Sequence, residues 1–291
     1  MPTHRRLTAE QEQHFLQYGF IQLSDAFDPE FIRSKRALAW ERLGMSETDP
    51  ATWTEERLHM SSSGYWRWSD IAPDAWELMC DLMGGVERTD PDARTGDGMV
   101  MNFRQGSDKP WVPPSPEANG WHKDGNFFRH YLDSPEQALL CIIIWKDIEP
   151  RGGGTFFAPD SVGVIARHML AHPEGLKPGE FGFKDLIAQC HDFRELTGKA
   201  GDLFIMHPFM LHSISYNHAG TPRMITNPVV RITEPFQFNR PDPADFSVLE
   251  RSILGALGVD RLDFQIQGER EHYKPNHTAA FEEYLKKRNA S

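Results

Sequence analysis

Residues 138–145 read Ala-Leu-Leu-Cys-Ile-Ile-Ile-Trp, an uninterrupted apolar run that is rich in isoleucine. A run of this length is too short to span a bilayer, and because no polar residue interrupts it, the pattern indicates a strand buried on both faces. Further strand patterns occur before and after it, at residues 20–23, 99–104, 155–158, 203–213 and 223–232. The central part of the chain is therefore expected to form an antiparallel β body.

Helical patterns flank this β body. Thr8-Ala-Glu-Gln11 is a capping box, so a helix is expected to begin there and to end at Gly19. Asp28-Pro29 begins a second helix that stops at Gly44, since aspartate is a good N-cap and proline suits the first helical position. Later helical patterns lie near residues 74–83, within 161–195, and near 244–257 and 278–287.

The chain is therefore expected to be mainly β with flanking helices, around a double-stranded β-helix core of the jelly-roll or cupin-like kind. Its 291 residues suit one large domain. We expect a helical N-terminal segment with mouth loops at residues 1–98, the jelly-roll core at 99–232 and a helical tail at 233–291. Loop composition at 45–64 and four prolines between residues 109 and 120 mark the two expected mouth loops.

Composition limits the partners. The formal net charge of −11 and the pI near 5.6 argue against nucleic acid or an anionic membrane surface. The N-terminal residues show no apolar segment typical of a secretory signal. Cys80, Cys141 and Cys190 are far apart and form no C-x-x-C pair, which favours buried thiols in a reduced, cytoplasmic protein. A small-molecule partner is expected, and a homodimer is compatible with these features.

The run Trp121-His-Lys-Asp-Gly125 is the first candidate for chemistry. On a strand, His122 and Asp124 would point to one side and Lys123 to the other. An imidazole and a carboxylate side by side form part of the 2-His-1-carboxylate triad, which binds non-haem Fe(II) and leaves open positions on the metal. A single His-x-Asp triplet is also typical of a surface strand with two solvated residues, so a second histidine is needed.

The strand expected at residues 203–213 contains His207 and His212. Their odd spacing places them on opposite faces of one regular strand, so only one of them can join the His-x-Asp pair. If the following hairpin pairs Arg223 with residues near Ile214, the guanidinium enters the same cavity. A buried arginine is costly unless an anion meets it, and its planar fork suits a carboxylate.

Taken together, these motifs resemble the phytanoyl-CoA dioxygenase family of Fe(II)/2-oxoglutarate-dependent oxygenases, over roughly residues 7–232. The matching features, in chain order, are Leu7-Thr8, Phe15, Gly19-Phe20, Trp121-His-Lys-Asp124, Gly153-Gly-Thr-Phe-Phe-Ala-Pro159, Ser161, Gly201-Asp202-Leu203, Leu211-His212-Ser213, Asn217 and Arg223. The chain departs from the family at Asp160 and Val162, where glycine and histidine are usual. This departure concerns a turn and the cavity shape rather than the metal ligands.

The resemblance implies that His122, Asp124 and His212 bind Fe(II), while Arg223 pairs with the distal carboxylate of 2-oxoglutarate. The implied enzyme uses Fe(II), 2-oxoglutarate and O₂ to oxidise an unactivated C–H bond. Aromatic and thioether side chains near the expected mouth favour a small or medium lipophilic metabolite as the substrate. Hydroxylation is the default outcome, with release of succinate and CO₂. The same chemistry could instead serve desaturation, epimerisation or ring rearrangement in specialised-metabolite biosynthesis.

Other assignments stay open at this point. By the resemblance, Asn102 and Thr155 lie near the cosubstrate, although each also fits an ordinary strand residue. A metal-dependent hydrolase and a non-catalytic jelly-roll binding protein are the alternatives from other classes. An apolar mouth is expected from aromatic and thioether side chains that would equally suit a core: Trp66, Trp68, Met99, Met101, Phe103, Trp111, Phe127 and Phe128.

Overall fold

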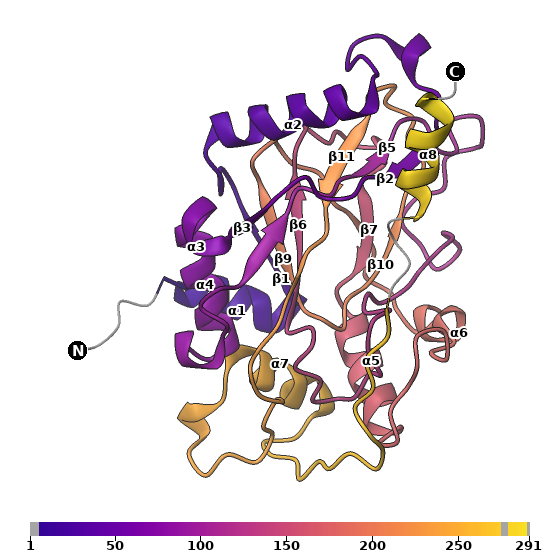
Figure 1. Cartoon of the computed structure of the whole chain (residues 1–291). Helices are drawn as coiled ribbons and strands as arrows, with labels where there is room; N and C mark the ends of the chain where they lie inside the picture. The colour runs from indigo at the N-terminus through magenta and orange to yellow at the C-terminus, as the bar shows by residue number, and fades with distance from the viewer. Residues whose placement is uncertain (1–5, 275–278, 290–291) are drawn as a thin grey trace.

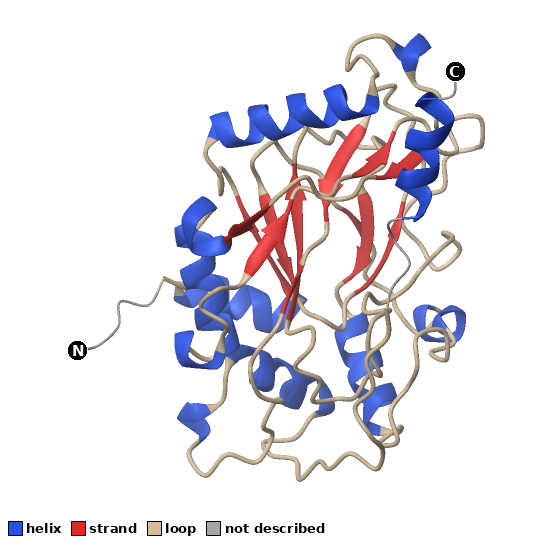
Figure 2. Cartoon of the chain, in the orientation of Figure 1, coloured by secondary structure: helices blue, strands red, loops and turns tan. Residues whose placement is uncertain are grey.

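The computed structural model describes residues 6–274 and 279–289, with strands gathered at the centre and helices around them (Figures 1 and 2). Two antiparallel sheets form the jelly roll, which confirms the predicted fold class. The larger sheet runs in the order β1 (Phe20–Leu23), β9 (Leu203–Met206), β6 (Leu139–Ile144), β11 (Arg223–Thr226), β5 (Val100–Asn102) and β2 (Arg57–His59), with β12 (Val229–Val230) paired to β6. The smaller sheet runs β10 (Leu211–Ile214), β7 (Thr155–Ala158) and β8 (Arg194–Glu195), and β3 (Tyr65–Arg67) pairs with β4 (Arg94–Gly96).

Helices lie on the outside of the sheets (Figure 2). They are α1 (Ala9–Tyr18), α2 (Pro29–Leu43), α3 (Trp68–Ile71), α4 (Pro73–Met83), α5 (Ser161–Leu170), α6 (Phe183–Ile187), α7 (Val248–Leu257) and α8 (Ala279–Asn289), with 3₁₀ turns at Pro50–Thr52, Val86–Arg88 and Pro243–Asp245. The two N-terminal helix predictions are confirmed: Thr8 and Gln11 form the capping box of α1, and Asp28 caps α2. The last helix was expected from Thr278, which lies outside the described residues.

The central strand β6 is buried along its whole length, as its composition predicts. Leu140, Ile142 and Ile144 pack between the two sheets with Phe157 of β7. The alternate residues belong to the larger core beneath the helices, where Cys141 Sγ lies 3.5 Å from Met79 Sδ on α4. The strand β6 is therefore buried on both faces, because one face lies between the two sheets and the other packs against the helices.

The prediction of one strand over residues 203–213 is wrong. β9 ends at Met206 in the larger sheet, and β10 begins at Leu211 in the smaller one. Pro208 between them has no N–H to donate to a ladder, and the N–H groups of Phe209 and Met210 bond back to His207. The chain thus changes sheet at this turn. Because His207 and His212 do not lie on one regular strand, their odd spacing does not decide which faces they occupy.

Other strand boundaries differ from the predictions for related reasons. The expected hairpin is wrong, because Ile214 pairs with Thr155 whereas Arg223 pairs with Asn102. The last strand is divided into β11 and β12, with Pro228 between them. Residues 45–64 are not only loop, since β2 lies within them, and residues 99–104 yield only the short β5.

The three cysteines are free and buried, as expected. Among the described helices, none is long and apolar enough to cross a membrane. The cytoplasmic location, the homodimer and the division of the chain at residues 98 and 232 stay predictions. The larger sheet extends beyond the predicted core, because β1 and β2 come from the N-terminal segment.

Candidate metal centre

His122 and His212 face each other across a single β-bridge. His122 N–H donates to the His212 carbonyl at 3.0 Å, and His212 N–H donates to the His122 carbonyl at 2.9 Å. Residues 121–125 make no further ladder with β10, so the segment is a loop held at one point rather than a strand. Because directly paired residues carry their side chains on the same side, the two imidazoles meet, with ring centroids 4.4 Å apart.

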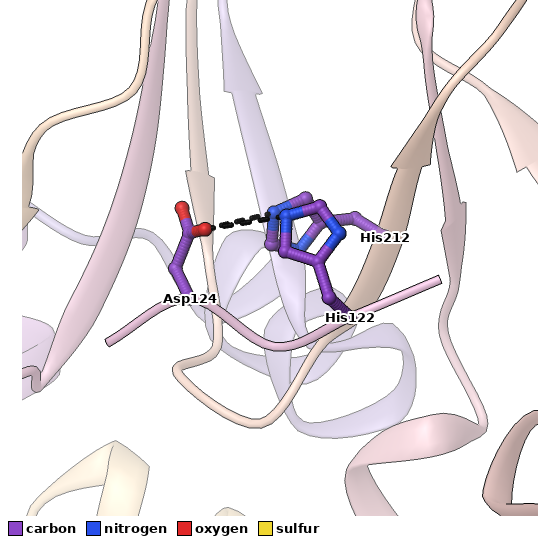
Figure 3. Close-up of side chains that lie close together, drawn as sticks. All are labelled: His122, Asp124 and His212. Carbon is purple, nitrogen blue, oxygen red and sulfur yellow. Dashed lines mark ion pairs between the residues drawn. The ribbon is translucent and has the colours of Figure 1, made fainter. Parts of the chain in front are cut away.

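Three donor atoms converge from these residues (Figure 3). Asp124 Oδ1 lies 3.4 Å from His122 Nε2 and 3.6 Å from His212 Nε2. All three possible ligand atoms lie within 4.8 Å of one another. In the described part of the chain, no other group of three His, Cys, Asp or Glu side chains comes together in this way. The structure therefore brings together the predicted triad.

Hydrogen bonds to backbone carbonyls fix the orientation of the two imidazoles. His122 Nδ1 lies 2.7 Å from the Gly120 carbonyl, and His212 Nδ1 lies 3.1 Å from the Met210 carbonyl. Since a carbonyl only accepts, each Nδ1 carries a proton, and each Nε2 is the ring atom that faces Asp124 and could bind a metal ion. Such bonds to the second ring nitrogen are the usual way in which proteins orient metal-binding histidines.

The carboxylate of Asp124 is held in its ionised form. Burial opposes its charge, but the neighbouring imidazoles, His212 foremost, outweigh burial and hold the pKa of Asp124 well below its usual value. Asn227 Nδ2 donates to Asp124 Oδ2 at 2.9 Å, which leaves Oδ1 directed at the histidines. For His122, burial alone would lower the pKa, but the hydrogen bond with Asp124, the charge of Asp124 and the hydrogen bond with the Gly120 carbonyl together outweigh burial and raise the pKa.

Lys123 points away from the triad, as the alternation of side chains predicts. Its Nζ lies 3.0 Å from His130 Nδ1 and donates to the Asp124 carbonyl at 3.2 Å. Burial lowers the pKa of Lys123 to about 7, and burial followed by the Lys123 charge holds the pKa of His130 well below its usual value. The Lys123–His130 pair therefore supports residues 121–125 on the side that faces away from the triad.

The triad opens into a cavity of about 560 Å³ that both sheets line. Arg223, only 2% exposed, lies in its wall and donates from Nε to the Gly153 carbonyl at 2.9 Å. No carboxylate in the described residues pairs with this guanidinium. Burial first, and then the charge of Arg57, lowers the pKa of Arg223 to about 9, so the side chain remains a cation at neutral pH. A buried cation without an acid partner has the chemistry to attract an anion.

Of the two remaining predicted residues, one reaches the cavity and one does not. Thr155 of β7 lines the cavity beside the triad. Asn102 faces inward in the same row as Arg223 but does not line the cavity; it is fully buried, and its amide donates to the Ser215 carbonyl at 3.3 Å and accepts from Gln105 N–H at 3.0 Å. The amide of Asn102 is thus already bonded within the fold.

Arg57 is a cavity residue that the sequence did not reveal. It lies on β2, in a segment expected to be loop, and it lines the cavity together with His59. Its backbone pairs with Asn102, which in turn pairs with Arg223, so the three residues form one row across β2, β5 and β11. The available signal was the short alternation Arg-Leu-His-Met at residues 57–60, in which Leu58 is buried in the core.

Comparisons with known proteins found similar solved structures. No family model and no curated protein matches the chain. One similar solved structure is the non-heme alpha ketoglutarate dependent epimerase SnoN from nogalamycin biosynthesis, with a TM-score of 0.42 and 17% identity over 76% of this chain and 81% of that one. A second is the non-heme alpha ketoglutarate dependent carbocyclase SnoK, with a TM-score of 0.43 and 16% identity over 94% of this chain and 100% of that one. A third is EctD from S. alaskensis with 2-oxoglutarate and 5-hydroxyectoine, with a TM-score of 0.44 and 16% identity over 79% of this chain and 78% of that one. At such identities the function has to be argued from the site itself.

The prediction of an apolar mouth is largely wrong. Of the eight aromatic and thioether side chains expected there, Met99 and Phe127 line the cavity. Four others are core residues at 1% exposure or less: Trp68, Met101, Phe103 and Phe128. Met101, for example, stands between two inward-facing residues of β5 and therefore points to the helices.

The departure from the family motif does not reach the cavity. Asp160 Oδ2 accepts the N–H groups of His191 and Asp192, and Val162 is buried beside Gly19. Neither residue lines the cavity of the triad.

Proposed function

We propose that the protein is an Fe(II)- and 2-oxoglutarate-dependent oxygenase that oxidises a C–H bond of a small or medium-sized organic substrate. One observation carries this proposal: the His122, Asp124 and His212 donors open onto the same cavity as Arg223, a buried cation that has no acid partner in the described part of the chain. A metal triad and a free carboxylate-binding guanidinium in one cavity are the requirements of a keto-acid cosubstrate.

The donor set fits ferrous iron. Two Nε2 atoms and one carboxylate oxygen on one side of the metal form the facial triad of non-haem Fe(II) oxygenases, which leaves positions for further ligands. A zinc-dependent hydrolase would use the triad alone and has no need of Arg223. A binding protein without a cosubstrate would bear the cost of a buried guanidinium without benefit.

We assign Arg223 and Thr155 to the distal carboxylate of 2-oxoglutarate, because both line the cavity beside the triad. When bound, iron and 2-oxoglutarate together supply O₂ activation, with conversion of the cosubstrate to succinate and CO₂. The chain's own contribution is geometric: the Gly153 carbonyl aims Arg223, and the apolar side chains of Val100, Ile142 and Ile225 keep that wall dry. Asn102 supports this wall as the backbone partner of Arg223.

Hydroxylation is the outcome we propose first. Asp124 occupies the carboxylate position of the triad, which favours oxygen transfer or oxidation over chemistry that needs an exogenous anion on the metal. The apolar part of the cavity, with Met99 and Phe127, suits a substrate with an apolar body. Epimerisation, desaturation or ring rearrangement would use the same protein residues.

The test is an anaerobic titration of the metal-free protein with Fe(II) and 2-oxoglutarate, following the visible metal-to-ligand charge-transfer band. We expect the band in the wild type, its loss in His212→Ala, and a need for far more 2-oxoglutarate in Arg223→Ala. His191→Ala and Arg33→Ala, at exposed positions, are the matched controls and should behave as wild type. Metal binding without the band would favour the hydrolase or the binding protein.

A further inference from the structure

Arg57 and Arg223 lie on the same inner face of the larger sheet, two strands apart. Both pair with Asn102 in the ladder, and neighbouring strands are about 4.8 Å apart, so the two backbones are about 10 Å apart. Arg223 is fully buried, whereas Arg57 belongs to the edge strand β2 and is exposed. Arg57 therefore stands nearer the mouth of the cavity.

The guanidinium of Arg57 has no acid partner among the described residues. Its Nη2 lies 2.9 Å from His59 Nε2, and no carboxylate of residues 6–274 or 279–289 lies within ion-pair distance of it. Because arginine keeps its proton, His59 Nε2 is the acceptor in this bond. The other N–H groups of Arg57 remain for a ligand in the cavity that this residue lines.

The charge of Arg57 acts on the centre of the site. It adds to the effect of burial in lowering the pKa of Arg223, so its field reaches the second arginine of the cavity. If iron and 2-oxoglutarate bind as proposed above, the charges of Fe(II) and Arg223 are balanced by Asp124 and the two carboxylates of the cosubstrate. The charge of Arg57 is left over, and a further anion would balance it.

We propose that Arg57 is an anion subsite at the cavity mouth that binds a carboxylate of the substrate to be oxidised. This inference rests on the proposed function, and it changes the expected substrate from a purely lipophilic molecule to one with an apolar body and an acidic group. A planar guanidinium with unused N–H donors can bind a carboxylate through two parallel hydrogen bonds. The other source of the same chemistry is the keto-acid end of 2-oxoglutarate, which the experiment separates.

The experiment is calorimetric titration of the anaerobic Fe(II)–2-oxoglutarate complex with matched pairs of probes: octanoate against 1-octanol, and benzoate against benzyl alcohol. We expect the wild type to bind the acids at least about tenfold more tightly than the alcohols, as a charge-assisted pair would. Arg57→Gln should lose this preference, Arg57→Lys should keep part of it, and Arg33→Gln on the surface of α2 should keep all of it. The affinity for 2-oxoglutarate, read from the charge-transfer band, should be unchanged in Arg57→Gln.

Each alternative outcome has a distinct meaning. Equal binding of acids and alcohols by the wild type, failure of both acids to bind, or a preference that persists in Arg57→Gln would overturn the inference. A tenfold or greater loss of 2-oxoglutarate affinity in Arg57→Gln would also overturn it, by assigning Arg57 to the cosubstrate. Absence of the charge-transfer band in the wild type would reject the proposed oxygenase function instead, and the acid preference would then be measured on the metal-free protein.

Discussion

The backbones of His122 and His212 bond to each other in both directions, at 3.0 and 2.9 Å, although the two residues are far apart in the sequence. This bridge joins a proline-rich loop to β10 at the point where the metal ligands stand. The Gly120 and Met210 carbonyls then orient both rings. The ligand geometry is therefore set by the backbone before a metal arrives, which is the preorganisation that a metal site needs.

The first prediction concerns Asn227, whose amide donates to the outer oxygen of Asp124 at 2.9 Å. We expect Asn227→Ala to weaken Co(II) or Fe(II) binding by about 10- to 100-fold, because the carboxylate loses the bond that orients it. His212→Ala should weaken binding further, since it removes a ligand. Anaerobic Co(II) titration followed by d–d absorption measures both affinities.

The control for this prediction is Asn239→Ala, because Asn239 is exposed and lies outside the cavity. It should bind Co(II) as the wild type does. Wild-type affinity in Asn227→Ala would mean that the histidines alone orient Asp124.

The second prediction concerns the stability cost of Arg223. Its guanidinium is buried with two backbone carbonyls and no described carboxylate around it. We expect metal-free Arg223→Met to be at least as stable as the wild type, because replacing an unneutralised buried charge by an apolar side chain removes a desolvation penalty. Urea denaturation of both proteins measures the free energy of unfolding.

Binding of Fe(II) and 2-oxoglutarate should reverse this order of stability and make the wild type the more stable protein. With Fe(II) and 2-oxoglutarate at about 100 times its Kd, the wild type should gain about 2.7 kcal/mol, whereas Arg223→Met should gain almost nothing from the cosubstrate. Arg33→Met, on the exposed face of α2, should follow the wild type in both conditions. A loss of more than about 2 kcal/mol in metal-free Arg223→Met would instead make Arg223 a structural residue.

Local sequence signals predicted those parts of the fold that depend on the composition of one segment or on interactions between residues close in the sequence. The capping box at Thr8 and the Asp28-Pro29 start produced the expected helices, since their hydrogen bonds lie within one turn. The apolar run of β6 also sufficed, because burial on both faces excludes polar residues. The His-x-Asp triplet and a later histidine, in the order that the family resemblance implies, were enough to indicate the triad.

What could not be predicted depends on pairing between distant segments. β2 has only three residues, and only its ladder with β5 makes it a strand and turns Arg57 into the cavity. Arg223 reached the cavity wall, but through β5 and β6 rather than through the expected hairpin with Ile214. Pro208 was a readable sign that residues 203–213 are interrupted, and it outweighs the apolar composition on either side.

The third prediction concerns pH and Glu250 on α7. This carboxylate is 2% exposed and accepts bonds from Arg240 at 2.8 Å, from the N–H groups of Gln237 and Ser247 at 2.7 and 2.8 Å, and from Arg88 at 3.3 Å. Burial opposes its charge, but the bonds from Arg240 and the two N–H groups outweigh burial and lower the pKa of Glu250. Glu250→Gln should cost about 2–3 kcal/mol at pH 7, allowing for the partly exposed arginines.

The pH dependence follows from the direction of this shift. Because the pKa is lower in the folded than in the unfolded state, the contribution of Glu250 is complete above the unfolded value of about 4.3 and disappears as the pH falls through the folded value. The difference in unfolding free energy between wild type and Glu250→Gln should therefore shrink below about pH 4.5. Glu282→Gln, on the exposed side of α8, should show no such trend. A difference that stays constant with pH would show that packing rather than charge sets it.

The last prediction concerns Gly153, whose carbonyl aims Arg223. Its φ of +78° suits glycine, and a Cβ there would lie 2.7 Å from Asn102 Nδ2 and 3.2 Å from Asn217 Cβ. Because the Asn102 amide is fixed by bonds to its neighbours, Gly153→Ala should cost about 2–4 kcal/mol. The displaced carbonyl should also weaken 2-oxoglutarate binding by about tenfold while leaving Co(II) affinity unchanged.

The matched control is Gly220→Ala, which has a similar φ of +71° but no heavy atom within 4 Å of the added Cβ. It isolates the backbone strain, which should cost about 1 kcal/mol without any effect on the cosubstrate. Urea denaturation and the charge-transfer titration of both variants provide the comparison. If Gly153→Ala lost no more stability than Gly220→Ala, the wall behind Arg223 would be free to move, and Gly153 could not be the residue that holds the guanidinium in place.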